Sequence, residues 1–295
     1  MARRRRAATG RFAGDEFPSV SESEFAHRDV RARQRDLPVV LSVIAPCLNE
    51  QSNIDPLIDR VLAAFDALPV SAELVLVDDG SADATWERMD DRAARDARVR
   101  ISQHLSNQGM VRAWQTGLAT ARGGLVCLID ADLQNRPEDI PRLYERFTRD
   151  DVNVVQGVRI FENAPWIRLV ISRGLNVLLN VAFGMHARDN KSGFILCRRD
   201  VLFQILRHRY RYRYFQSFLG PAAKVRGFTI AEIETLHEPR RAGTSFLPRI
   251  PIGVILRLCW ETLKYRVESW CERPCERSRE RMVPSTPAFT LPRSA

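Results

Sequence analysis

Short apolar runs alternate with amphipathic stretches across the first half of the chain. The runs have the length of buried strands, and the stretches between them repeat apolar residues at helical spacing. The predicted strands are Val39–Ala45, Glu73–Val77, Val99–His104, Leu125–Ile129 and Asp151–Gly157. Helices are predicted over about 53–67, from about 81, over 107–121 and after Pro137. This alternation predicts an α/β fold, a mostly parallel sheet with helices on both faces.

The second half of the chain has a different pattern. Residues 166–185 show helical periodicity, Gly193–Cys197 and Ile230–Leu236 are strand-like, and 250–267 form an amphipathic helix. The charged residues before 37 have no periodicity, which indicates disorder. We predict a disordered basic arm over 1–36, one large domain over 37–248, a C-terminal amphipathic helix over 249–270 and a frayed tail over 271–295.

The composition is that of a soluble globular protein, with 45% hydrophobic and 27% charged residues. A net charge of +9 suits a phosphorylated substrate, anionic lipid or nucleic acid. The cysteines form neither a disulfide framework nor a zinc site, because Cys271 and Cys275 lack a second ligand pair. There is no signal peptide and no apolar segment of the ~20 residues that span a bilayer. We therefore expect a cytoplasmic protein, peripheral at most to the cytoplasmic face of the membrane.

Carboxylates and an amide follow the fourth predicted strand directly, in Asp130-Ala131-Asp132-Leu133-Gln134. Oxygen ligands of this kind suit a hard divalent cation that shares a phosphate. The alternative is an exposed acidic strand end, which is common in α/β proteins.

Two further strand ends are polar, Pro46-Cys47-Leu48-Asn49-Glu50 and Asp78-Asp79-Gly80-Ser81. Ligands of such sheets bind beyond the carboxyl ends of the strands, so the three segments are expected to share a site. Neither G-x-G-x-x-G nor G-K-[ST] is present, which excludes the usual phosphate-binding loops of dinucleotide-binding and P-loop proteins. Asp79 is placed to accept a hydrogen bond from a base, while a metal neutralises a diphosphate.

The order of motifs resembles the inverting GT-A glycosyltransferases of family 2. The motifs are P-x-x-N-E, V-D-D-G-S, N-x-G-x-x-x-A-x-x-x-G, D-A-D-L-Q, G-x-R, S-R-G-x-N and D-N-K-S-G-F. The chain is most similar to the polyprenyl-phosphate branch, which includes dolichol-phosphate mannose synthase, over about 38–250. The resemblance implies a GT-A fold and transfer of a single sugar from a nucleotide sugar to a polyprenyl phosphate.

The resemblance also implies roles for individual residues. The nucleotide-binding residues would be Pro46, Asn49, Glu50, Asp78, Asp79 and Asp130. The ligands of Mg²⁺ or Mn²⁺ would be Asp130, Asp132 and Gln134. The acceptor phosphate would be bound by Arg159, Ser172 and Arg173, because the planar guanidinium bonds phosphate oxygens bidentately. Arg173 has the alternative of a solvated helix residue, but it interrupts an apolar helix, where an unpaired charge is costly.

The expected reaction is attack of an acceptor phosphate oxygen on the anomeric carbon, with inversion and departure of the nucleoside diphosphate. The residues expected to take part are Asp132, Arg159, Arg173 and Asp189. A phosphate acceptor is already anionic, whereas a hydroxyl acceptor needs a general base, and Asp189 is the candidate. Alternatively, Asp189 orients Lys191 or caps a turn.

Some features depart from the branch. Gly243-Thr244-Ser245-Phe246 has Phe246 where relatives have a Lys, and Arg240 and Arg241 are candidate substitutes. Q-x-x-R-W is missing, which argues against polymerisation. Two alternatives follow: transfer to a soluble hydroxyl acceptor in glycan or secondary-metabolite synthesis, and a non-catalytic module that binds nucleotide sugar or lipid.

The 250–267 helix, with Trp260 between Arg257 and Lys264, suits the headgroup region of a membrane. The alternatives are packing on its own domain or on a partner subunit of a homo-oligomer. Arginines and tyrosines interleaved over 207–214 suit anionic lipid as well. Without a nucleic-acid fold signature, no nucleic-acid partner is expected.

Overall fold

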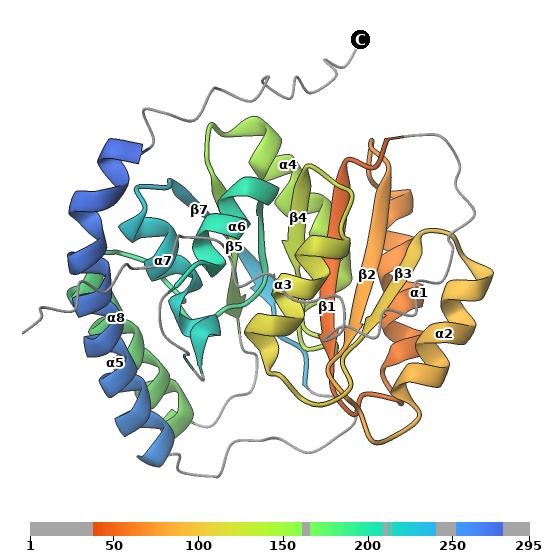
Figure 1. The fold of residues 1–295 in the computed structure, drawn as a ribbon, viewed down its shortest axis with the longest axis horizontal. Coiled ribbons are helices and arrows are strands. Elements are labelled where there is room, and N and C mark those ends of the chain that lie inside the picture. Colours follow the sequence, from red (N-terminus) through yellow and green to blue (C-terminus); the bar gives the residue numbers. More distant parts are fainter. Residues whose placement is uncertain (1–37, 161–165, 209–211, 213, 240–251, 280–295) are drawn as a thin grey trace, which may run out of the picture.

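The computed structural model describes residues 38–160, 166–208, 212, 214–239 and 252–279. Within these residues, seven strands form one sheet in the order β3-β2-β1-β4-β6-β5-β7 (Figure 1). The strands are β1 Leu41–Cys47, β2 Ala72–Asp78, β3 Val99–Gln103, β4 Leu125–Leu128, β5 Val154–Ile160, β6 Ile195–Arg198 and β7 Ile230–Leu236. All pairs are parallel except those of β6, which runs antiparallel to β4 and β5. The predicted mostly parallel α/β fold is confirmed.

Helices cover both faces of the sheet (Figure 1). The first face carries α1 Ile54–Asp66, α2 Thr85–Arg95 and α4 Ile140–Arg149, the last preceded by the 3₁₀ turn η2 Pro137–Asp139. The second face carries α3 Met110–Thr120, α6 Arg199–Leu206, the turn η3 Phe215–Phe218 and α7 Leu219–Val225. Alternate residues of β1 serve the two cores, Val43 the first and Ile44 the second. This is the period-two pattern that a sheet buried on both faces requires.

Two further helices, α5 Trp166–Phe183 and α8 Ile252–Arg279, pack against each other at one side of the domain (Figure 1). The α8 helix enters the second core through Leu258 and Tyr265. Its buried Glu261 and Glu268 accept hydrogen bonds from the Tyr214 backbone N–H and the Tyr212 hydroxyl. These contacts fix α8 on its own domain.

The predicted boundary at residue 270 is wrong for this helix, since α8 continues through the start of the predicted tail to Arg279. The prediction of a tail relied on the charged, proline-containing composition after Cys271, but the charged residues there are also good helix formers. The predicted arm over 1–36 and the tail beyond 279 lie outside the described residues. None of the helices in the described part combines the length and apolar character needed to cross a bilayer.

Candidate functional site

The carboxyl ends of β1, β2 and β3 lie in register at one edge of the sheet. Cys47 pairs with Asp78, and Asp78 pairs with Gln103. The backbone continues this register, because Asp79 N–H donates to Cys47 O and His104 N–H donates to Asp78 O, each at 2.8 Å. The parallel sheet therefore brings the first two predicted polar segments together.

Asp79 organises the loop after β3. Its buried carboxylate accepts the backbone N–H groups of Gln108 at 2.9 Å and Gly109 at 2.8 Å. His104 Nδ1 donates to the same carboxylate, because an ionised carboxylate only accepts, and the other ring nitrogen lies 2.8 Å from Thr116 Oγ1. Contact between Asp79 and a nucleotide base stays a prediction, and the structure adds that Asp79 holds residues 104–109 in place.

Asn49 and Glu50 cross-link the first two strand ends. Asn49, in the left-handed region at φ 55°, donates its backbone N–H to Ser81 Oγ at 2.9 Å and accepts the Ala82 N–H at 2.8 Å. Glu50 N–H donates to Thr85 Oγ1 at 2.8 Å. The loop that carries the expected nucleotide-binding residues is thus held by hydrogen bonds to the residues that follow β2.

Asp130 and Asp132 follow β4, beside these loops, and both are partly exposed. Asp130 Oδ2 accepts hydrogen bonds from Asn135 Nδ2 and Gln216 Nε2, each at 3.2 Å, whereas Oδ1 has no hydrogen-bond partner among the described residues. Burial and then the Asp132 charge raise the pKa of Asp130 to about 6. Two carboxylates that repel each other at a polar strand end are the donor set that a bound cation stabilises.

The described residues contain no cluster of three or more His, Cys, Asp or Glu side chains that would hold a metal by itself. A pair of carboxylates instead fits a hard cation that takes its other ligands from water and a diphosphate. Gln134 lies in the same loop and is partly exposed, and its backbone N–H donates to Asp132 Oδ1 at 3.1 Å. The predicted ligands Asp130, Asp132 and Gln134 therefore fit such an ion.

Gln216 reaches Asp130 because Gly193 leaves room for it. A Cβ atom at Gly193 would lie 2.4 Å from Gln216 Nε2, much closer than a real contact. The D-N-K-S-G-F motif thus contributes a close packing position as well as polar side chains.

The loop after β4 is also fixed by the chain that leaves β7. Asn135 forms an isolated bridge with His237, and Glu238 N–H donates to Gln134 O at 2.9 Å. Arg60 of α1 then pairs with both Glu138 at 2.7 Å and Glu238 at 3.1 Å. These links hold the loop that carries Asp132 and Gln134.

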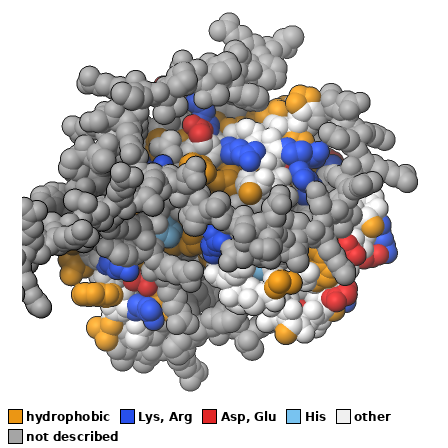
Figure 2. All heavy atoms as spheres, viewed as in Figure 1, with side chains coloured by type: hydrophobic (Ala, Val, Ile, Leu, Met, Phe, Trp, Pro, Cys, Tyr) orange, Lys and Arg blue, Asp and Glu red, His pale blue; other side chains and the backbone are white. Residues whose placement is uncertain are grey.

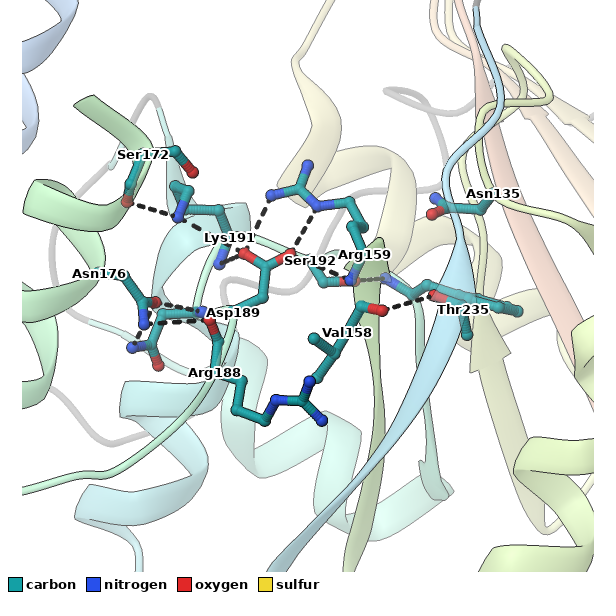
Figure 3. A network of polar contacts seen from close by, with 12 residues as sticks. Asn135, Val158, Arg159, Ser172, Asn176, Arg188, Asp189, Lys191, Ser192 and Thr235 are labelled. Carbon is teal, nitrogen blue, oxygen red and sulfur yellow. Dashed lines mark hydrogen bonds and ion pairs between the residues drawn. The ribbon is translucent and has the colours of Figure 1, made fainter. Parts of the chain in front are cut away.

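A second polar network lies around Arg159 of β5 (Figure 3). Arg159 Nε donates to Asp189 Oδ2 at 2.7 Å, and Nη2 donates to Oδ1 at 3.1 Å. Lys191 Nζ donates to the Ser172 backbone carbonyl at 3.1 Å and lies 3.5 Å from Asp189 Oδ1. Burial raises the pKa of Asp130, and the charge of Arg159 acts in the opposite direction. The network around Arg159 is therefore electrostatically coupled to Asp130, a predicted metal ligand.

Asparagines of α5 hold the loop that carries Asp189 and Lys191. Asn176 Nδ2 donates to Ala187 O at 2.8 Å, and its Oδ1 accepts the Asn190 backbone N–H at 2.8 Å. Asn180 exchanges hydrogen bonds with Ala187, in both directions, and accepts one from Asn190 Nδ2. The position of this loop is therefore set by α5.

The structure brings together Arg159, Asp189 and the backbone of Ser172, but treats Arg173 differently. Arg173 is exposed, which fits the alternative of a solvated helix residue, and its role in acceptor binding stays a prediction. The Ser172 hydroxyl has no hydrogen-bond partner among the described residues, and only its carbonyl contacts Lys191. Phe246, Arg240 and Arg241 lie outside the described residues.

Sequence reasoning did not assign roles to several residues of the site, namely His104, Thr116, Asn135, Lys191 and Gln216. His104 stands at the end of a predicted strand, where a polar residue is a usable signal. Gln216 carries no such signal, because it reaches Asp130 only through the tertiary fold.

The family model for glycosyl transferase family 2 matches residues 42–206. Dodecaprenyl-phosphate galacturonate synthase of Rhizobium johnstonii is 31% identical over 207 residues, 70% of this chain and 61% of that protein. Undecaprenyl-phosphate 4-deoxy-4-formamido-L-arabinose transferase of Aeromonas hydrophila is 33% identical, over 70% of this chain and 62% of its own length. The chain thus spans somewhat under two thirds of the length of these two relatives.

Among solved structures, glucosyl-3-phosphoglycerate synthase from Mycobacterium tuberculosis, in complex with Mn²⁺, UDP and glucosyl-3-phosphoglycerate, has a similar fold. The TM-score is 0.59 and the identity 22%, over 77% of this chain and 80% of that one. The same protein is also known in complex with Mg²⁺ and UDP. At this identity the likeness shows the shared fold.

Proposed function

The chain belongs to glycosyl transferase family 2, and we propose that it transfers a single sugar from a nucleotide sugar to a polyprenyl phosphate. The observation that carries the proposal is the pairing of Arg159 with Asp189 beside the carboxylate of Asp130. It sets a cationic group for an acceptor phosphate next to an acidic group for a metal and diphosphate. The relatives named for dodecaprenyl and undecaprenyl phosphate support the same acceptor class.

In this proposal each strand end binds a different part of the two substrates. The loops that contain Asn49, Glu50 and Asp79 bind the nucleotide, with Pro46 and Asp78 in their support. Asp130, Asp132 and Gln134 would hold Mg²⁺ or Mn²⁺, which supplies positive charge to the diphosphate leaving group. Arg159 orients the acceptor phosphate, whose oxygen attacks the anomeric carbon from the face opposite the leaving group.

The state of Asp189 favours a phosphate acceptor over a hydroxyl one. Burial acts to raise the pKa of Asp189, but hydrogen bonds and charge from Arg159, together with Lys191, bring it below the ordinary value. A carboxylate with a low pKa and occupied oxygens is a weak general base. A phosphate acceptor does not need one, because it already carries the attacking negative charge.

We also propose contact with the cytoplasmic face of a membrane, through large apolar side chains that α5 and α8 leave in solvent. Those of α5 are Val170, Val177 and Val181, and those of α8 are Leu256, Trp260, Leu263 and Val267. Figure 2 shows hydrophobic side chains at its lower left, where Figure 1 places these two helices. Because the two helices pack against each other, their exposed apolar side chains can enter the same region of a membrane.

The proposal is tested by incubating the full chain with Mn²⁺, a set of UDP-sugars and a short-chain polyprenyl phosphate in detergent. Mass spectrometry should find a lipid-linked sugar phosphate, and EDTA should prevent its formation. Asp132→Ala should lower the rate by roughly a hundredfold or more. Asp91→Ala, at an exposed helix position whose one ion-pair partner in the described part of the chain is Arg95, should leave the rate unchanged. Product on a hydroxyl acceptor but never on the lipid would favour the soluble-acceptor alternative, and binding without turnover on any donor would favour the binding module.

A further inference from the structure

Asp189, Arg159 and Lys191 form a compact group with more positive than negative charge. The side chains are 17%, 8% and 16% exposed for Arg159, Asp189 and Lys191, respectively. One carboxylate therefore serves two cations in a largely buried place (Figure 3). Because Asp189 holds a guanidinium and an ammonium side by side, the two cationic groups are placed to bind one phosphate together.

The Asp189 carboxylate is fully used within the protein. Besides the two bonds from the Arg159 guanidinium, it accepts the backbone N–H groups of Arg159 at 3.4 Å and Lys191 at 3.1 Å. Its oxygens thus hold the two cationic residues in fixed positions, by backbone and side chain together. Asp189 is arranged as a positioning residue.

Lys191 has donor capacity beyond these contacts. An ammonium carries three N–H donors, and among the described residues only the Ser172 carbonyl and Asp189 Oδ1 lie within hydrogen-bond or ion-pair distance of Nζ. Burial lowers the pKa of Lys191, while Asp189 acts against this shift. An added anion would stabilise the charged ammonium in the same way.

We propose that Lys191 and Arg159 form a two-point clamp for the phosphate monoester of the acceptor, with Asp189 as the residue that positions both. The inference rests on the proposed function and assigns Lys191 a part in it. The clamp supplies a lysine from the loop after α5, in a chain whose segment 243–246 has Phe246 where relatives have a lysine. The shared chemistry is a phosphate monoester, which either a lipid or a small soluble acceptor can present.

The test measures binding by the full chain in the presence of UDP and Mn²⁺, with farnesyl phosphate in one arm and 3-phosphoglycerate in the other. Lys191→Met should weaken binding of the monoester roughly tenfold to a hundredfold, the loss expected for a charge-assisted hydrogen bond. Lys191→Arg should recover most of the affinity. Lys224→Met, at an exposed lysine of α7, is the matched control and should bind as the wild type does. UDP binding should be equal in all four proteins.

Asp189→Asn separates positioning from base catalysis. A positioning role predicts a higher acceptor KM with a smaller change in kcat and an unchanged pH profile, partly rescued by Asp189→Glu. A loss confined to kcat, together with a lost acidic limb of the pH profile, would overturn the positioning role.

Wild-type affinity of Lys191→Met for both monoesters would overturn the clamp. So would a wild-type protein that binds UDP with Mn²⁺ but neither monoester. Lys191-dependent binding of 3-phosphoglycerate alone would support the clamp and reject the lipid acceptor of the proposed function, so the two failures are distinguishable.

Discussion

His104 Nδ1 lies 2.7 Å from Asp79 Oδ1, so two buried side chains join the end of β3 to the end of β2. The same carboxylate binds the backbone of Gln108 and Gly109. One acidic residue therefore sets the path of a whole loop beside the expected nucleotide site.

Asp79→Asn keeps the size of the side chain but replaces an acceptor with an NH₂ group that faces backbone donors. We expect the free energy of unfolding to fall by about 3 kcal/mol, because buried donors lose their partner. Urea unfolding measures this change. Asp91→Asn, at an exposed position, should change it by no more than about 0.5 kcal/mol. Equal losses in the two variants would refute the organising role of Asp79.

Gly80→Ala should disturb the same loop from the other side. Gly80 has φ +75°, and a Cβ atom there would lie 2.5 Å from the Ser106 carbonyl carbon. Backbone strain and the clash together should cost at least about 2 kcal/mol. Gly124→Ala is the control, because no atom lies within 4 Å of its Cβ position. Circular dichroism melts should show a lower Tm for the first variant only.

The pairing of Asp189 predicts a pH dependence of stability. Its pKa in the folded protein is lower than the ordinary value of 3.8, so the stabilisation is complete well above that value and is lost as the pH falls through the folded pKa. The difference in unfolding free energy between the wild type and Asp189→Asn should be largest near pH 7 and shrink below about pH 4. Urea unfolding at a series of pH values tests this. A difference that grows on acidification would contradict it.

The exposed stripe of α8 predicts binding to lipid vesicles. The double variant Trp260→Ser, Leu263→Ser removes two large side chains that are 66% and 57% exposed. Each contributes about 1.5–3 kcal/mol when buried, so co-sedimentation with phosphatidylglycerol vesicles should fall at least tenfold. Leu105→Ser, at a leucine that is 74% exposed on a distant loop, should co-sediment as the wild type does. Retention of all three proteins in the supernatant would reject membrane contact.

Much of this architecture could be predicted from sequence because local pattern and global fold agree. Strand–helix alternation identified the sheet, and the carboxylates after β2 and β4 predicted the edge at which the candidate site lies. The predicted end of β1 at Ala45 was less accurate, because Pro46 also belongs to the strand. A proline is tolerated there, since β4 pairs only with Leu41–Ile44 and does not reach that position.

Features that depend on tertiary contacts could not be predicted from the sequence. The apolar run of β6 suits either direction, so its antiparallel pairing had no sequence signal. The contact between Asp189 and Arg159, which bears on the two predicted roles of Asp189, also depends on the fold. The exposure of Arg173 likewise depends on which face of α5 meets the domain.

The α5 helix has two faces with different tasks. Val170, Val177 and Val181 lie in solvent, while Ser172, Asn176 and Asn180 hold the loop of Asp189 and Lys191. The α5 helix therefore joins an exposed apolar stripe directly to the loop that carries Asp189 and Lys191. A ligand that shifted α5 against the sheet would shift this loop with it, because the hydrogen bonds of Asn176 and Asn180 tie the loop to the helix.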